Sequence, residues 1–446
     1  MTAKIGMISL GCAKNLINSE QMMHLLKEAG YEVTGETDDA DAVVLNTCGF
    51  IESAKMEAIE TIVELGSMKS KGRIGKLIVA GCLPERYKND IMIDMPEIDA
   101  IVGVGSFDGI ADAVRIALEG GKGTALFGDI DAPVSETARI ITTSPAWAYM
   151  KIAEGCDNRC AFCVIPDIRG RFRSRKIENV VNEARELAGR GVKELIIVAQ
   201  DVTRYGLDLY GKRRLTDLLK ELCAIEPLKW IRLHYLYPDE IDENLVDVIA
   251  EHDKILKYLD IPIQHINDEI LSKMHRRGTS GEIRSLFERL RARIPGVVLR
   301  TSVITGLPGE GVKEFEELGK FLREMKIERA GVFSYSPEEG TLAAQMGRPD
   351  SDEAARRAEI IADIQSLVMD EFNESRIGSI TTLLLEGRDK ERYHGRSYAE
   401  SPDVDGYITV KGVKSDNIAI NELIEVRITG AENGELQAEA IINDER

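Results

Sequence analysis

Residues 154–163 read Glu154-Gly155-Cys156-Asp157-Asn158-Arg159-Cys160-Ala161-Phe162-Cys163, which places three cysteines in a Cys-x3-Cys-x2-Cys pattern. We call Cys156, Cys160 and Cys163 the central triad. Three thiolates this close together can bind an iron–sulfur cluster and leave one iron open for a cofactor. A zinc site completed by a distant histidine, such as His234 or His265, is one alternative, and three inert thiols are another. Zinc knuckles usually use Cys-x2-Cys pairs, so the spacing favours the cluster.

The central triad follows a predicted strand at 148–153 and opens a regular alternation of strands and helices. Further strands are predicted at 194–199, 230–236, 258–262, 299–305 and 331–335. Six strand–helix units predict a partial (β/α)6 barrel with its working face at the carboxyl ends of the strands. Gln200 and Asp201 end the second strand and Gln264 follows the fourth, so we expect them to line a cofactor pocket. Simple strand-end hydrogen bonding is the alternative role.

A second set of cysteines lies in the first hundred residues, which also alternate between predicted strands and helices. Cys12, Cys48 and Cys82, which we call the N-terminal triad, each close a predicted strand, at 5–10, 42–45 and 77–80. Such alternation predicts a parallel α/β sheet, and ligands of such sheets bind beyond the carboxyl ends of the strands. The shared position therefore predicts one common site, and the alternative is three unrelated buried thiols.

The remaining sequence completes a three-domain organisation. Residues 130–147 are rich in turn formers and predict a linker, and residues 351–376 predict a long helix. From residue 380 onwards, short alternating strands predict a small antiparallel β-barrel. We therefore expect domains at residues 1–130, 142–375 and 376–446.

Composition and charge restrict the function further. The 446 residues are 43% hydrophobic and 30% charged, which excludes a fully disordered chain. No apolar run is long enough for a membrane span and the start leaves no room for a signal peptide, so we expect a cytoplasmic protein. The net charge is −19, and residues 376–446 carry −5 of it, so nucleic acid is an unlikely partner and a basic protein fits better. The alternative is that the charge only maintains solubility.

The central triad at the start of a six-unit barrel resembles the radical S-adenosylmethionine (SAM) superfamily. Other segments resemble its methylthiotransferases, and the C-terminal barrel resembles their TRAM domain. These segments are Ser9-Leu10-Gly11-Cys12-Ala13-Lys14-Asn15, Asn46-Thr47-Cys48, Gly81-Cys82, Ile261-Pro262-Ile263-Gln264-His265 and Ser334-Tyr335-Ser336-Pro337-Glu338-Glu339-Gly340-Thr341. The resemblance spans essentially the whole chain, in the domain order of the family.

The resemblance implies that each triad holds a 4Fe–4S cluster. In the family, the central cluster cleaves SAM to a radical that takes hydrogen from the substrate, and the second, auxiliary cluster handles the sulfur. The implied cofactors are therefore two 4Fe–4S clusters and SAM. The implied partners are an electron donor such as flavodoxin or ferredoxin, and a sulfur donor.

The segment at residues 9–15 also resembles one branch of the family, which modifies the β-carbon of an aspartate in the small-subunit ribosomal protein numbered twelve. The alternative branch modifies an adenosine in tRNA and typically reads Gly-Cys-Gln-Met-Asn there, and a rival of another class is a non-catalytic cluster carrier. Guanidinium groups bind carboxylates in a bidentate manner. We therefore expect one or two members of a basic run, Arg169 first, to hold the cofactor carboxylate or the target aspartate, with a solvated basic turn as the alternative. The run comprises Arg169, Arg171, Arg173 and Arg175.

Overall fold

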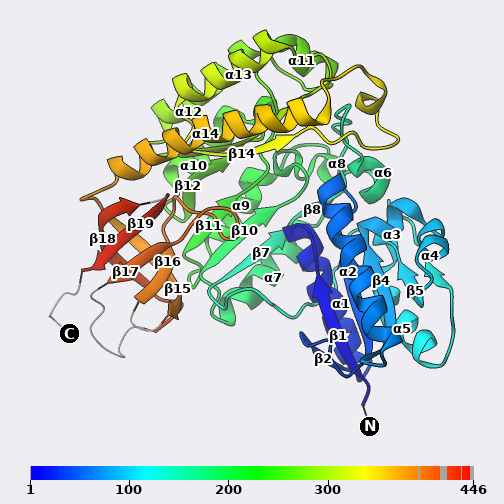
Figure 1. Cartoon of the computed structure of the whole chain (residues 1–446). Helices are drawn as coiled ribbons and strands as arrows, with labels where there is room; N and C mark the ends of the chain where they lie inside the picture. Colours follow the sequence, from blue (N-terminus) through cyan, green and yellow to red (C-terminus); the bar gives the residue numbers. More distant parts are fainter. Residues whose placement is uncertain (1, 390–391, 412–418, 433, 442–446) are drawn as a thin grey trace.

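The computed structural model describes residues 2–389, 392–411, 419–432 and 434–441. Three units follow one another along the chain, an N-terminal α/β sheet, a central sheet flanked by helices and a C-terminal β-barrel (Figure 1). Among the described residues, no helix combines the length and the apolar character that a membrane crossing needs.

The N-terminal unit is a six-stranded sheet in the order β2-β1-β3-β4-β5-β6, and every neighbouring pair is parallel. Separate apolar clusters cover its two faces, one built with α1 and α5 and the other with α2 and α4, which is why the central strands are almost wholly buried. The strands are β1 (Lys4–Ser9), β2 (Glu32–Thr34), β3 (Ala40–Thr47), β4 (Ile74–Gly81), β5 (Ala100–Val102) and β6 (Thr124–Leu126). The helices are α1 (Ala13–Glu28), α2 (Glu52–Ser70), α3 (Cys82–Tyr87), α4 (Asp90–Asp94), the 3-10 helix η1 (Val104–Gly109) and α5 (Ile110–Leu118).

The central unit is an open six-stranded parallel sheet in the order β14-β13-β12-β11-β10-β7. One face packs against its helices in the main apolar core, and the predicted partial barrel is confirmed. Its strands are β7 (Trp147–Lys151), β10 (Glu194–Val198), β11 (Trp230–Leu233), β12 (Ile255–Asp260), β13 (Val298–Thr305) and β14 (Arg329–Ser334), with a separate ribbon of β8 (Ala153–Glu154) and β9 (Arg173–Ser174). Its helices are α6 (Ile165–Arg169), α7 (Ile177–Gly189), η2 (Val202–Arg204), α8 (Leu207–Tyr210), α9 (Leu215–Cys223), η3 (Pro238–Glu240), α10 (Glu243–Glu251), α11 (Asp268–Lys273), α12 (Ser280–Arg293), α13 (Val312–Met325) and η4 (Ala343–Gln345).

Helix α14 (Ser351–Ser375) leads to a closed five-stranded barrel, in the order β15-β16-β17-β19-β18. The neighbouring pairs are antiparallel except β17–β19, which is parallel. An odd number of strands cannot alternate in direction around a closed barrel, so one parallel pair is required. The strands are β15 (Ile380–Asp389), β16 (Arg392–Arg396), β17 (Ile408–Lys411), β18 (Leu423–Glu432) and β19 (Glu435–Ala440).

Buried ion pairs and hydrogen bonds connect this barrel to the central sheet. Glu194 at the start of β10 pairs with Arg232 of β11 and Arg396 of β16, each at 2.7 Å, and all three side chains are fully buried. In the loop between β16 and β17, Ser401 Oγ lies 2.9 Å from His234 Nε2, and Asp405 accepts a hydrogen bond from the Tyr258 hydroxyl at 2.7 Å. The C-terminal barrel is therefore held rigidly on the central unit.

Candidate functional site

The three cysteines of the N-terminal triad lie at the carboxyl ends of adjacent strands. Cys48 directly follows β3, Cys82 directly follows β4, and Cys12 precedes α1 in the short turn after β1. Neighbouring strands lie about 4.8 Å apart, so the order β1-β3-β4 brings the three segments together. Gly11 has φ +90°, and a Cβ built there would lie 2.7 Å from the Cβ of Cys48, so only glycine fits between the first two cysteines.

The ionisation of these thiols reflects burial and their closeness to one another. Burial, reinforced by Cys82 and Cys12, raises the pKa of Cys48 to about 12. Burial likewise raises the pKa of Cys82. Desolvation by neighbouring atoms would raise the pKa of Cys12, although its side chain is exposed, but Lys14 and Arg169 outweigh it, so that this pKa lies below its usual range. Thiols of this kind bind metal as thiolates and release protons when they do, which fits an iron–sulfur cluster as the bound group.

The Arg169 guanidinium joins the N-terminal triad to the central unit. Its Nη2 donates to Cys82 Sγ at 3.3 Å and to Asn15 Oδ1 at 3.1 Å. Its Nη1 donates to Glu154 Oε1 at 2.9 Å, two residues before Cys156. The expectation that Arg169 holds the cofactor stays a prediction, since the structure shows these contacts within the chain.

Positive charge is concentrated around these thiols. Lys14, Lys151 and Arg169 are all buried, and the carboxylate of Glu154 pairs with Lys151 at 2.8 Å and with Arg169. Lys14 Nζ lies 3.6 Å from the centre of the Tyr235 ring. Buried cations need compensating negative charge, and a cluster held by thiolates would supply it. The donor set and its surroundings therefore fit an anionic iron–sulfur cluster.

The central triad lies in the loop between β8 and α6. Burial raises the pKa of Cys156 to about 11, with Cys160 adding to it, and burial with Cys160 raises the pKa of Cys163. Cys160 Sγ lies 3.7 Å from Arg276 Nη1 and 3.8 Å from the Tyr237 hydroxyl. A second guanidinium therefore accompanies the second group of thiols.

Two of the three predicted strand-end residues, Gln200 and Asp201, bond to residues in or next to the central triad loop, whereas the backbone of Gln264 bonds to β13. Asp201 Oδ2 accepts a hydrogen bond at 2.8 Å from Asn158, which lies within the central triad loop. Gln200 Nε2 donates to Glu154 Oε1 at 2.9 Å, whereas its own Oε1 is buried without a hydrogen-bond partner among the described residues. Gln264 adopts φ +71°, and its backbone bonds both Ser302 and Ile304 of β13. The unpaired acceptor of Gln200 fits a bound molecule that carries a hydrogen-bond donor, such as an amino group.

The N-terminal triad lies beside the segment that carries the central triad, because Cys82 packs with Val164, the residue after Cys163. Helix α6, which begins two residues after Cys163, lies beside α3, and its Ile168 packs with Cys82 and Val164 (Figure 1). Nearby, buried Glu338 binds Arg86 at 2.6 Å and Lys55 at 3.1 Å, and so links the loop after β14 to α3 and α2. Packing and ion pairing therefore hold the N-terminal triad against the loop of the central triad.

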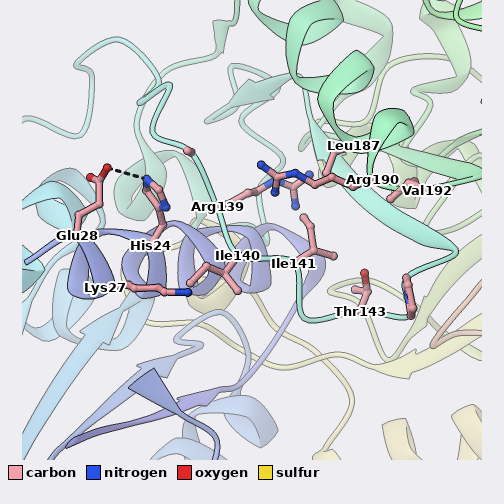
Figure 2. A pocket seen from close by; sticks show the side chains of 12 residues that line it. His24, Lys27, Glu28, Arg139, Ile140, Ile141, Thr143, Leu187, Arg190 and Val192 are labelled. Carbon is pink, nitrogen blue, oxygen red and sulfur yellow. Dashed lines mark ion pairs between the residues drawn. The ribbon is translucent and has the colours of Figure 1, made fainter. Parts of the chain in front are cut away.

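Other locations are less suited to chemistry. Within the described parts of the chain, no three His, Cys, Asp or Glu side chains are arranged to hold a single metal ion. A cluster places each thiolate on a different iron and tolerates wider spacing. A surface hollow of about 680 Å³ lies between α1, the linker and α7, where His24 and Glu28 form an ion pair (Figure 2). Thiol groups are absent from its lining, and His24 lies three turns along α1 from Cys12.

Several residues of the site have no signal in the sequence. Glu154, Lys14 and Arg276 each lie near a triad, and Arg276 is 116 residues from its partner Cys160. Lys14 and Glu154 stand next to the cysteine motifs, which could have drawn attention to them, whereas no local pattern marks Arg276.

Three segments of the chain match known families. Residues 4–103 match the uncharacterized protein family UPF0004, residues 150–322 the radical SAM superfamily, and residues 377–441 the TRAM domain. The chain is 45% identical to ribosomal protein uS12 methylthiotransferase RimO of Acetivibrio thermocellus, over 99% of both chains. It is 46% identical to the protein of the same name from Pelotomaculum thermopropionicum, over 99% of this chain and 100% of that one.

Solved structures share the fold at low sequence identity. The radical SAM methyltransferase TsrM from Kitasatospora setae, with cobalamin and a 4Fe–4S cluster bound, has a TM-score of 0.55 at 14% identity, over 94% of this chain and 80% of that one. The cobalamin-dependent SAM radical enzyme OxsB has a TM-score of 0.52 at 13% identity, over 81% and 56%. These likenesses concern the fold alone. The chain is 45% and 46% identical to two RimO proteins over almost its whole length, and it matches the radical SAM superfamily and the TRAM domain. These findings show that the chain belongs to the radical SAM methylthiotransferase family.

Proposed function

We propose that this protein is a radical SAM methylthiotransferase that adds a methylthio group to the β-carbon of an aspartate in ribosomal protein uS12. The observation that carries the proposal is the contact between the two cysteine-bearing segments, where Cys82 packs with Val164 next to Cys163, in a chain 45% identical to a RimO protein. A carbon–sulfur bond at an unactivated carbon needs a radical and a sulfur source in one cavity, and this arrangement provides places for both.

The residues that would hold the cofactors follow from the geometry. The central triad would bind the cluster whose open iron takes SAM, and the N-terminal triad would bind a second cluster. When bound, these groups would supply the hydrogen-abstracting radical and the sulfur to be transferred. Gln200 and Gln264 would line the SAM pocket, and Asp201 would hold the triad loop through Asn158. The packing of α6 against α3 would keep water away from Cys82, which is buried there.

The substrate assignment rests on the relatives and on charge. The net charge of −19, with −5 in residues 376–446, favours a basic protein over the phosphate backbone of a tRNA. The tRNA reading therefore ranks second. We further propose the domain boundaries 1–130, 142–375 and 376–446, a cytoplasmic location, and an electron donor and a sulfur donor as partners.

One experiment tests the proposal. Anaerobically reconstituted protein should contain about eight irons if each triad holds a four-iron cluster, and it should form deoxyadenosine from SAM and dithionite. Replacing the central triad by alanine should leave the N-terminal iron and abolish deoxyadenosine. Offering uS12 and tRNA separately, with mass spectrometry of each, then identifies the substrate. A methylthio group on tRNA alone refutes the substrate assignment, and intact clusters without deoxyadenosine indicate a cluster carrier.

A further inference from the structure

Each cysteine triad has one guanidinium group at one of its sulfur atoms. Arg169 Nη2 lies 3.3 Å from Cys82 Sγ, and Arg276 Nη1 lies 3.7 Å from Cys160 Sγ. Both arginines are less than one-tenth exposed, at 1% for Arg169 and 8% for Arg276. A guanidinium is charged at every physiological pH, so each triad has a permanent buried cation beside it.

Arg169 has the more extensive contacts of the two. Its second partner on the N-terminal side, Asn15, donates through Nδ2 to the carbonyl of Leu10 at 2.8 Å and to that of Thr47 at 3.0 Å. Leu10 lies two residues before Cys12, and Thr47 directly precedes Cys48. Through Cys82 directly and through Asn15 indirectly, one guanidinium therefore contacts or orients all three loops of the N-terminal triad.

The other end of the Arg169 network lies at Glu154, two residues before the first cysteine of the central triad. Glu154 accepts hydrogen bonds from Arg169 and Gln200, each at 2.9 Å, and pairs with Lys151 at 2.8 Å. This carboxylate offsets part of the buried positive charge, and Arg169 keeps one donor group, Nη2, directed at Cys82 and Asn15. The position of the guanidinium is thus fixed from both sides.

We propose that Arg169 is a positioning residue that holds the three loops of the N-terminal triad together and raises the reduction potential of the cluster they bind. Hydrogen bonds to cluster sulfurs and nearby positive charge favour the reduced, more negative form of a cluster. Arg276 performs the corresponding task at Cys160 of the central triad. Arg169 thereby makes the N-terminal cluster easier to reduce than its thiolates alone would allow. This inference rests on the proposed function, because it requires that both triads bind clusters.

The test uses the anaerobically reconstituted full chain in two backgrounds. Replacing the central triad by alanine leaves the N-terminal cluster to be observed alone, and replacing the N-terminal triad leaves the central one. In each background we compare four proteins by iron content, electron paramagnetic resonance and potentiometric titration. One keeps both arginines, and the others carry Arg169→Gln, Arg169→Lys or Arg276→Gln. SAM turnover is not needed for any of these readouts.

We expect Arg169→Gln to weaken the preference of the N-terminal cluster for the reduced state at least tenfold, a shift of about 59 mV to more negative potential for one electron. Arg169→Lys keeps the charge and should shift the potential less. If Arg169→Gln loses the N-terminal iron while Arg169→Lys retains it, the result supports the role of Arg169 in holding the three loops together. The reduction potential of the N-terminal cluster is then measured in the lysine variant. Arg276→Gln should affect only the central cluster.

Two results overturn the inference. One is an unchanged N-terminal potential in Arg169→Gln at full iron content, and the other is an equal shift of both clusters by that substitution. The failure of the proposed function looks different, because the chain with both triads and both arginines intact would then bind only one cluster or none.

Discussion

Glu338 offers the sharpest test of how the N-terminal unit is held over the central triad. Its carboxylate is 1% exposed and binds Arg86 at 2.6 Å and Lys55 at 3.1 Å. Burial alone would raise the pKa of Glu338, but the hydrogen bonds from Ser336, Arg86 and Lys55 outweigh it and lower the pKa, so the group is ionised at neutral pH. Glu338→Gln keeps the shape of the side chain and removes this charge.

The expected loss of stability at this contact depends on the partners that Lys55 and Arg86 keep when the charge of Glu338 is removed. Breaking a buried ion pair by removing one partner costs about 3–5 kcal/mol. Lys55 retains Glu52 at 2.6 Å and Arg86 retains the carbonyl of Gly49 at 2.9 Å, so we take the lower end, about 3 kcal/mol. At about 1.4 kcal/mol per tenfold, the contact between the units should open roughly 100 times more often.

Two measurements report this opening: amide hydrogen exchange, and the amount of deoxyadenosine formed per methylthio group transferred. Amide protection should fall roughly 100-fold in peptides covering residues 48–55 and 336–341, and more deoxyadenosine should form per methylthio group transferred. The matched control is Glu339→Gln, the same change one residue further along the loop at an exposed position. Protection and coupling equal to those of the control would refute the role given to the Glu338 contacts.

Three further predictions concern the triads and the C-terminal barrel. Replacing the N-terminal triad by alanine should remove half the iron, measured by iron analysis, and leave deoxyadenosine formation from SAM intact. Gly49→Ala should lower N-terminal iron specifically, because its Cβ would meet the backbone of Leu83 at 2.9 Å, whereas Gly189→Ala has open space around it and serves as the control. Arg376 and Arg329 lower the pKa of Glu400 from 4.5 to about 2 although burial alone would raise it. The resulting stabilisation, about 3 kcal/mol, is present above pH 4.5 and lost as the pH falls towards 2, so urea unfolding of Glu400→Gln should depend less on pH in that window.

The positions of most long strands, and of the cysteines at strand ends, could be predicted from the sequence, because both follow from local hydrophobic runs. The predicted strand at 194–199 corresponds to β10, which ends one residue earlier. The strand predicted at 258–262 begins at Ile255 and ends at Asp260, before Pro262, whose missing N–H cannot join the ladder. Strands β5 and β6 were not predicted, because three residues are too few to show a period.

Most polar contacts of the site could not be predicted, because they join residues far apart in sequence. Arg169 and Cys82 are 87 positions apart, and Arg86 and Glu338 are 252 apart. A local pattern shows that an arginine follows the central triad, but it does not show whether that arginine meets a cofactor, a substrate or a thiol. Only the docking of α6 on α3 decides which of these the guanidinium contacts.

The distribution of charge explains how an acidic chain can hold negatively charged clusters. Surface charges are screened over about 8 Å at physiological salt, so the distant acidic surface acts on partners and hardly on the thiols of the triads. In the interior the lower effective dielectric strengthens every interaction. Close to the N-terminal triad the charge is the reverse: Lys14 and Arg169 lie beside its thiols, and Arg169 and Lys151 share the carboxylate of Glu154. The exterior can therefore favour a basic protein while the interior stabilises anionic metal centres, and neither requirement limits the other.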